Sequence, residues 1–209
     1  MIRVLLADDQ RLIRAGLRML IEDTDDITVA GEAADGVEAV RLHTELCPDL
    51  VIMDLRMPGL DGIGATRRIL ATDPRAKVLV LTTFDDDEHL FPALSAGATG
   101  YFVKDTDPAV LLAAIRRTVE GDLPFSPTLL RRLVARALIT PPEMPAPPAD
   151  LTPRERDVLR LVAEGHGNQE IADRLHLGVS TVKTHITNLL DKTGTDNRVR
   201  LAVYASKLP

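Results

Sequence analysis

The stretch Leu50-Val51-Ile52-Met53-Asp54-Leu55-Arg56-Met57-Pro58-Gly59-Leu60-Asp61-Gly62 begins with an apolar run that ends in a carboxylate. A short apolar run without polar alternation is typical of a strand that is buried on both faces. Pro58-Gly59 and Asp61-Gly62 are turn signals, and a helix is expected from there to about Leu70. The segment therefore predicts a buried strand, a loop that begins at Asp54, and a helix.

The same order of strand and helix recurs through the first 121 residues. Strands are expected at 2–7, 27–31, 50–53, 78–81 and 101–103. The intervening helices are expected at 11–21, around 37–46, up to about 70, at 86–96 and at 108–120. Strands that alternate with helices form a parallel sheet with helices on both faces. The fold class predicted for this part is therefore α/β, with a doubly wound five-stranded parallel sheet.

Polar side chains directly follow four of these strands. Asp8 and Asp9 follow the first strand, Asp54 the third, Thr82 the fourth and Lys104 the fifth. In open parallel sheets the ligand site lies beyond the carboxyl ends of the strands. A lone aspartate at a strand end is more often a helix cap or a solvated loop residue. Five polar residues that converge on one edge instead favour a functional site.

The chemistry that these residues offer is phosphoryl transfer. Three carboxylates in one place repel one another and stay ionised only if a cation lies among them. Hard oxygen ligands beside a phosphate favour Mg²⁺. Asp54 can then act as a nucleophile and form an acyl phosphate. Lys104 offers a point charge to Asp54 or to the phosphate, and the Thr82 hydroxyl can donate to a phosphate oxygen.

On these motifs, residues 1–121 resemble the receiver domain of response regulators, which has a flavodoxin-like fold. Ala96-Gly97-Ala98-Thr99-Gly100-Tyr101-Phe102-Val103-Lys104 completes the pattern. The resemblance implies that Asp54 accepts phosphate from a sensor histidine kinase, in the manner of a phosphorelay. It also implies that Mg²⁺ is held by Asp9, Asp54 and the backbone carbonyl of Arg56, with Asp8 reaching it through water. Thr82 and Tyr101 resemble the switch pair of the family.

One enzyme family offers a rival interpretation. Haloacid-dehalogenase phosphatases also end an apolar strand in a phosphorylated aspartate, but they need a second aspartate two residues later. That position holds Arg56 in this chain. The sequence therefore favours a regulator over an enzyme.

The composition favours a cytoplasmic protein, and the net charge differs between segments of the chain. One cysteine, Cys47, cannot form an internal disulfide and is expected in the core. No apolar stretch approaches a membrane span, and the start does not resemble a signal peptide. Residues 1–122 carry a net charge of −9, residues 123–149 carry +2 and residues 150–209 carry +1. The acidic part should repel a polyanion.

The expected domains are a receiver at 1–121, a linker at 122–149 and a small all-α domain at 150–209. Five prolines among residues 140–149 exclude a helix or a central strand there, and a helix from Ser126 to about Ile139 is expected before them. Thr152-Pro153-Arg154-Glu155 predicts a capping box. Four helices are expected, at about 153–164, 168–175, 179–193 and 197–206.

The last 60 residues resemble the LuxR-type helix-turn-helix, on the motifs Asn168-Gln169-Glu170-Ile171-Ala172 and Ser180-Thr181-Val182-Lys183-Thr184-His185. In the third helix of this part an apolar stripe packs inward and the polar residues face outward, as a major-groove reader requires. The expected DNA contacts are Lys183, Thr184 and Thr187 at base edges, Thr181 and His185 at phosphates or in packing, and Asn168 and Gln169 at a helix start near a phosphate. The net charge of +1 is small for this role.

The whole chain thus resembles a response regulator of the NarL/FixJ family. The resemblance implies regulation of transcription through promoter DNA, with phosphorylation-dependent homodimers on a two-fold site. RNA polymerase is a further candidate partner, and no membrane is expected. The alternative is an interaction protein that binds no DNA, which the intact recognition-helix motif disfavours.

Overall fold

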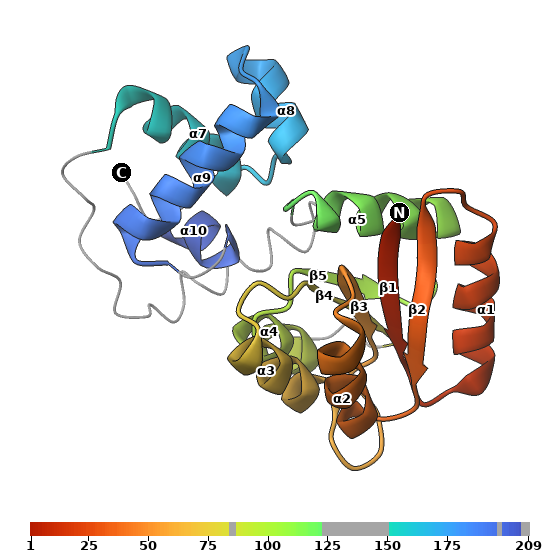
Figure 1. Ribbon diagram of the computed structural model, residues 1–209. Helices are drawn as coiled ribbons and strands as arrows, with labels where there is room; N and C mark the ends of the chain where they lie inside the picture. Colours follow the sequence, from red (N-terminus) through yellow and green to blue (C-terminus); the bar gives the residue numbers. More distant parts are fainter. Residues whose placement is uncertain (84–86, 123–150, 196–197, 206–209) are drawn as a thin grey trace. The chain divides into compact units, whose positions relative to one another are not determined.

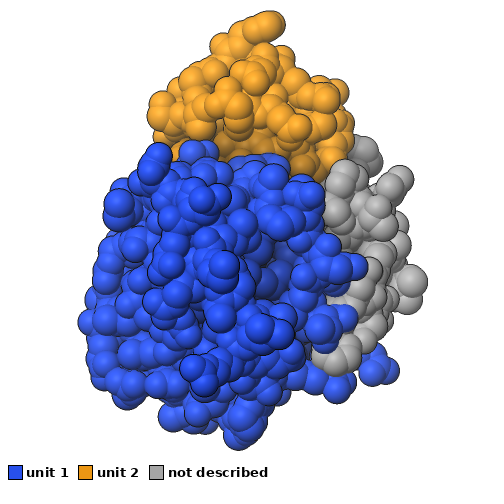
Figure 2. Space-filling model, turned by 90° about the vertical axis from the view of Figure 1, so that its right-hand side faces the viewer, with its two compact units in different colours: residues 1–120 blue, residues 121–209 orange. Residues whose placement is uncertain are grey.

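The computed structural model describes residues 1–83, 87–122, 151–195 and 198–205 (Figure 1). The chain divides into two compact units, Met1–Glu120 and Gly121–Pro209 (Figure 2). The helix expected from Ser126 and the proline-rich stretch after it lie outside the described residues. Within the described part, no helix is long and apolar enough to cross a membrane.

The first unit contains a five-stranded sheet whose paired strands are all parallel. Its order is β2-β1-β3-β4-β5, so the strands that precede Asp8 and Asp54 are direct neighbours. The strands are β1 (Ile2–Ala7), β2 (Ile27–Ala33), β3 (Leu50–Met53), β4 (Val78–Thr82) and β5 (Gly100–Val103). This arrangement confirms the α/β fold class predicted from the alternating elements.

Four helices connect the strands and a fifth follows β5, and together they cover both faces of the sheet (Figure 1). They are α1 (Arg11–Glu22), α2 (Gly36–Leu46), α3 (Gly62–Thr72), α4 (Asp87–Ser95) and α5 (Pro108–Val119). One apolar core joins α1 and α5 to the face that carries Val4, Leu6 and Ile52. A second core joins α2 and α3 to the opposite face, which carries Leu5 and Met53. Burial on both faces explains why these strands are apolar throughout.

The second unit contains four described helices: α7 (Pro153–Ala163), α8 (Asn168–Leu175), α9 (Val179–Thr193) and α10 (Arg198–Ala205). The predicted capping box at the start of α7 is present, because Thr152 and Glu155 bond each other's backbone N–H groups. Gly194 ends α9 in the left-handed conformation at φ 64°. All four helices share one apolar core that includes Leu159, Ile171 and Leu189.

One expectation about the core is wrong. Cys47 is exposed and does not pack in the interior. It caps α2 in the left-handed conformation, with φ at 44°. Pro48 follows it, and a residue before proline is disfavoured in a helix, so α2 ends here and the side chain leaves the packed face.

Candidate functional site

Three carboxylates meet at the carboxyl edge of the sheet. Asp8, Asp9 and Asp54 place one carboxylate oxygen each within 4.8 Å of one another. Backbone pairing fixes this position, because the Asp54 N–H donates to the Ala7 carbonyl at 2.8 Å. Asp8 and Asp54 are buried while Asp9 is exposed, so the cluster opens to solvent on one side. Oxygen ligands at this spacing fit a hard divalent cation.

Lys104 joins two of these carboxylates. Its Nζ lies 2.7 Å from Oδ2 of Asp8 and 2.9 Å from Oδ2 of Asp54. The backbone N–H of Lys104 donates to the Thr82 carbonyl at 2.8 Å, which ties the end of β5 to the end of β4. The remaining oxygens also have donors: Asp54 Oδ1 accepts from the Leu55 N–H and Asp8 Oδ1 from the Gln10 N–H, each at 2.8 Å.

Burial controls the electrostatics of this pocket. It raises the pKa of Asp54; the hydrogen bond from Lys104 acts against this increase, and the Asp8 carboxylate adds to it. Burial alone would lower the pKa of Lys104, but its hydrogen bonds to Asp8 and Asp54 outweigh that effect and raise it. The lysine therefore stays cationic while Asp54 is held in an environment that penalises its negative charge. A second cation would relieve that penalty.

The two residues that resemble a switch pair lie on neighbouring strands: Thr82 is at the carboxyl edge of the sheet, and Tyr101 pairs with Val80, two residues before that edge. Thr82 ends β4 and is fully buried, and Tyr101 in the neighbouring strand β5 is 4% exposed. Arg56 lies two residues after Asp54 in the following loop and is exposed. The structure thus brings together Asp8, Asp9, Asp54 and Lys104, with Thr82 beside them.

Two further residues support the pocket, and sequence patterns did not identify their roles. Arg14 of α1 donates through Nη1 to the Asp8 carbonyl at 2.6 Å and through Nε to Glu32 at 3.2 Å, so it fixes the loop that carries Asp8 and Asp9. Gly62 lies against the Asp54 backbone: a Cβ there would lie 2.0 Å from the Asp54 carbonyl oxygen. The sequence predicted a turn at Asp61-Gly62, but it did not predict this close approach of Gly62 to the Asp54 backbone.

The second unit presents the outer face of α9. Val182, Ile186 and Leu189 are buried in the core of the unit. Four of the expected DNA-contacting residues are exposed, namely Thr181, Lys183, Thr184 and Thr187, and His185 is half-buried. The hydroxyls of Thr184 and Thr187 each donate to the backbone carbonyl four residues earlier, at 3.1 Å. Their methyl groups and remaining lone pairs stay available to a base edge.

The two residues at the start of α8 differ in their surroundings. Gln169 is exposed and its Nε2 donates to Asp173 at 2.9 Å. Asn168 is buried, and its backbone N–H donates to Oδ1 of Asp122 at 2.7 Å. Its side-chain oxygen accepts from Arg198. The backbone N–H and the side-chain oxygen of Asn168 are therefore already engaged within the unit, which the sequence could not indicate.

Together, the two units define a class of protein. An α/β unit carries an acidic pocket whose residues suit phosphoryl transfer, and a helix-turn-helix unit follows it in the chain. Comparison with known proteins agrees with this class. The family of response regulator receiver domains matches residues 4–116, and the luxR family of bacterial regulatory proteins matches residues 149–205. The transcriptional regulatory protein LiaR of Bacillus subtilis is 43% identical over 207 residues, which cover 99% of this chain and 98% of LiaR.

Solved structures show the same organisation. The response regulator ChrA of a haem-sensing two-component system is 37% identical with a TM-score of 0.54, over 99% of this chain and 96% of that one. A structure of two RcsB dimers bound to two parallel DNAs is 26% identical with a TM-score of 0.59, over 99% of each chain. The chain belongs to the NarL/FixJ family of two-component response regulators, with a receiver domain and a LuxR-type helix-turn-helix. It is a transcription regulator and not an enzyme.

Proposed function

We propose that Asp54 is the phosphoacceptor of this regulator and takes its phosphoryl group from a sensor histidine kinase. The observation that carries the proposal is the convergence of Asp8, Asp9 and Lys104 on the carboxylate of Asp54. An Asp54 oxygen attacks phosphorus, and the bond from phosphorus to the kinase histidine breaks. The product is an acyl phosphate on Asp54 and a free imidazole on the kinase.

Lys104 changes its partner during this step. Before transfer it pairs with Asp54 Oδ2 at 2.9 Å. After transfer one oxygen of Asp54 is bonded to phosphorus, and the ammonium group then neutralises the new phosphoryl charge. The Thr82 hydroxyl, at the end of the neighbouring strand, donates to a phosphoryl oxygen, and Tyr101 fills the space behind it.

We also propose that the acidic cluster holds Mg²⁺ through Asp9, Asp54 and the Arg56 carbonyl, with Asp8 acting through water. The ion supplies charge neutralisation for a phosphoryl group that approaches three carboxylates. The oxygen donors within 4.8 Å of one another and the opening at Asp9 support this assignment.

Labelling with acetyl phosphate tests the phosphoacceptor directly. Wild type should gain one acid-stable, hydroxylamine-sensitive phosphoryl group that maps to Asp54, and EDTA should prevent it. Asp54→Ala should gain none, whereas Asp49→Ala, which changes an exposed aspartate five residues earlier, should be labelled like wild type. Equal labelling of Asp54→Ala would refute the assignment.

The DNA-reading part of the proposal rests on α9. Lys183, Thr184 and Thr187 lie on its exposed face, and Lys183 can donate to guanine in the major groove. Thr181 and His185 would contact phosphates or pack, and Gln169, which is exposed at the start of α8, would approach a phosphate. Selection of binding sites from random duplexes by the phosphorylated chain tests this; failure to enrich any sequence would refute it.

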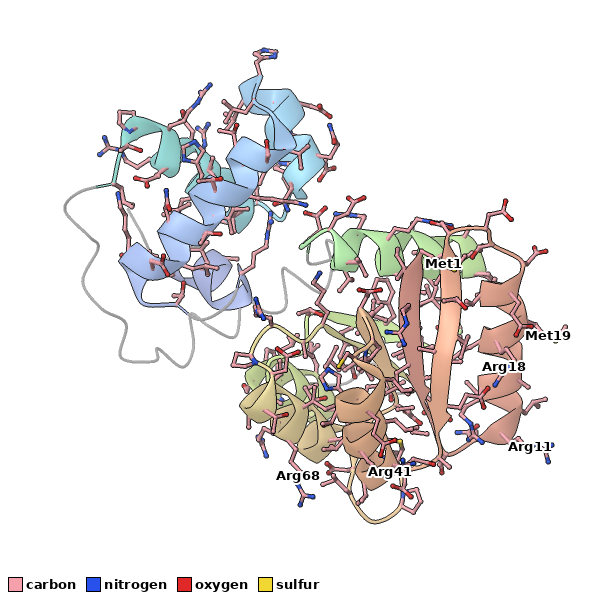
Figure 3. The ribbon with its side chains drawn as sticks, viewed as in Figure 1. Met1, Arg11, Arg18, Met19, Arg41 and Arg68 are labelled. Atoms are coloured by element: carbon pink, nitrogen blue, oxygen red, sulfur yellow. The ribbon has the colours of Figure 1, made fainter. Side chains whose placement is uncertain are left out.

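Homodimers on promoter DNA complete the proposal, because one helix-turn-helix reads only a short half-site. Large apolar side chains on the outer side of α1 support pairing of receivers: Leu12 is 83% and Met19 is 73% exposed. In Figure 3 the labelled Met19 points away from the sheet. Sedimentation of the full-length chain should show dimers when BeF₃⁻ is present and monomers when it is absent. RNA polymerase would be a further partner at the promoter, and the lone cysteine supports a cytoplasmic setting.

A further inference from the structure

A buried polar cluster in the second unit has no part in the proposed reaction or in base reading. Asp122, Asn168 and Arg198 are 5%, 3% and 9% exposed. Asp122 Oδ1 accepts the backbone N–H of Asn168 at 2.7 Å and lies 3.9 Å from Nη1 of Arg198. The Arg198 guanidinium also donates to the Asn168 side chain and to the His166 carbonyl. Three segments far apart in the sequence are therefore held by one carboxylate.

Within this cluster, the Asp122 carboxylate lies at the amino end of α8. The first N–H groups of a helix have no partner within the helix, and the end of the helix carries partial positive charge. The preceding residue, Gly167, has no side chain to cap this end. Asp122 supplies the anion from outside the helix, and the Arg198 guanidinium strengthens the attraction.

The amino end of α8 is also where a helix-turn-helix is expected to approach the DNA backbone. The first helix of this motif crosses the backbone, and helix amino ends bind phosphate oxygens through free N–H groups. While Asp122 accepts the Asn168 N–H, that group cannot donate to a phosphate. The Asp122 carboxylate also places a negative charge where a polyanion would approach.

The chain position of Asp122 connects this contact to the receiver. Helix α5 ends at Val119, and Asp122 follows three residues later. Only Glu120 and Gly121 lie between the end of α5 and Asp122, so Asp122 follows the receiver almost directly in the chain.

We propose that Asp122 is an inhibitory clamp, whose carboxylate occupies the phosphate-contacting end of α8 and must leave it before the unit binds DNA tightly. The clamp rests on the proposed function, because it regulates that DNA-binding surface. Phosphorylation of Asp54 favours the state in which Asp122 is released, and a backbone phosphate then takes its place on the Asn168 N–H.

The test compares unphosphorylated full-length variants on a duplex selected from random sequence by the phosphorylated wild-type chain. Asp122→Asn removes the charge but keeps nearly the same shape, and it should tighten binding by about tenfold, within the range of known coupling between sites. The substitution should also reduce the additional increase in DNA affinity that BeF₃⁻ produces. Glu120→Gln removes an exposed charge two residues earlier and should leave affinity nearly unchanged. Unaltered or weaker binding by a folded Asp122→Asn would overturn the proposal.

A second measurement needs no substitution. Hydrogen exchange of the Asn168 amide in the wild-type chain should accelerate when BeF₃⁻ is added and slow again when the selected duplex is added. Exchange that does not respond to BeF₃⁻ would overturn the clamp. If the phosphorylated wild-type chain selects no duplex at all, the proposed function has failed. If it selects one but Asp122→Asn binds like wild type, only the clamp has failed.

Discussion

Replacement of Gly62 by alanine should damage both the stability and the phosphorylation of the receiver. A Cβ at this position would lie 2.0 Å from the Asp54 carbonyl oxygen and 2.9 Å from both the Asp54 carbonyl carbon and Leu55 Cα, and real Cβ contacts stay above 3.0 Å. All three atoms belong to the backbone and cannot rotate away. The Asp54 loop must therefore move by about an ångström, and overpacking of this kind costs about 3 kcal/mol at the upper end of its usual range.

The same displacement moves the nucleophile. A misplacement of about 1 Å can slow a reaction roughly a hundredfold, so phosphorylation of Gly62→Ala by acetyl phosphate should fall by about that factor. Gly16→Ala is the matched control: Gly16 lies inside α1 with nothing within 4 Å of its would-be Cβ, so alanine should stabilise the receiver by about 1 kcal/mol.

Urea unfolding measures both variants in one domain. The chain has no tryptophan and two tyrosines, one in each unit, so a Tyr204→Phe background leaves Tyr101 as the reporter of the receiver. Unfolding of Gly62→Ala at the same urea concentration as its background, together with phosphorylation at the same rate, would refute this prediction.

Three other substitutions have definite expected outcomes. The Thr152 N–H and then Lys192 lower the pKa of Glu155, so its contribution to stability is present above its ordinary pKa of 4.5 and is lost as the pH falls through the lowered value. Glu155→Gln should cost the second unit about 2 kcal/mol at neutral pH and flatten its acid unfolding curve; an unchanged curve would count against this. Arg14→Ala should weaken Mg²⁺ binding about tenfold by calorimetry, because it frees the Asp8 carbonyl, and unchanged affinity would remove Arg14 from the support of the site. Lys183→Ala should cost about 1–3 kcal/mol on the selected duplex and relax one base position; equal affinity and selectivity would exclude a base contact.

Much of the fold was predictable because its signals are local. The apolar runs that form β1, β3 and β4 are buried on both faces, and turn signals separate them from the helices. The pocket was predictable for a related reason. The carboxyl ends of parallel strands meet at one edge, so Asp54 and Lys104 converge although 50 residues separate them.

Other features depend on contacts that no local pattern records. Asp122 and Asn168 are 46 residues apart, and neither lies in a motif that would pair them. In the sequence, Arg14 is indistinguishable from any other polar residue of α1. Its hydrogen bond to the Asp8 carbonyl depends on the geometry of the loop that follows β1. Cys47 was expected in the core because free cysteines are usually buried, but the end of α2 placed it outside.

The whole proposed function depends on control of DNA binding by the phosphoryl group on Asp54. Its most direct test is the affinity of the full-length chain for the selected duplex, with and without acetyl phosphate and Mg²⁺, for wild type and Asp54→Ala. Wild type should bind more tightly after phosphorylation, and Asp54→Ala should stay at the affinity of the unmodified chain. A wild type that does not respond, or an Asp54→Ala variant that responds equally, would contradict it.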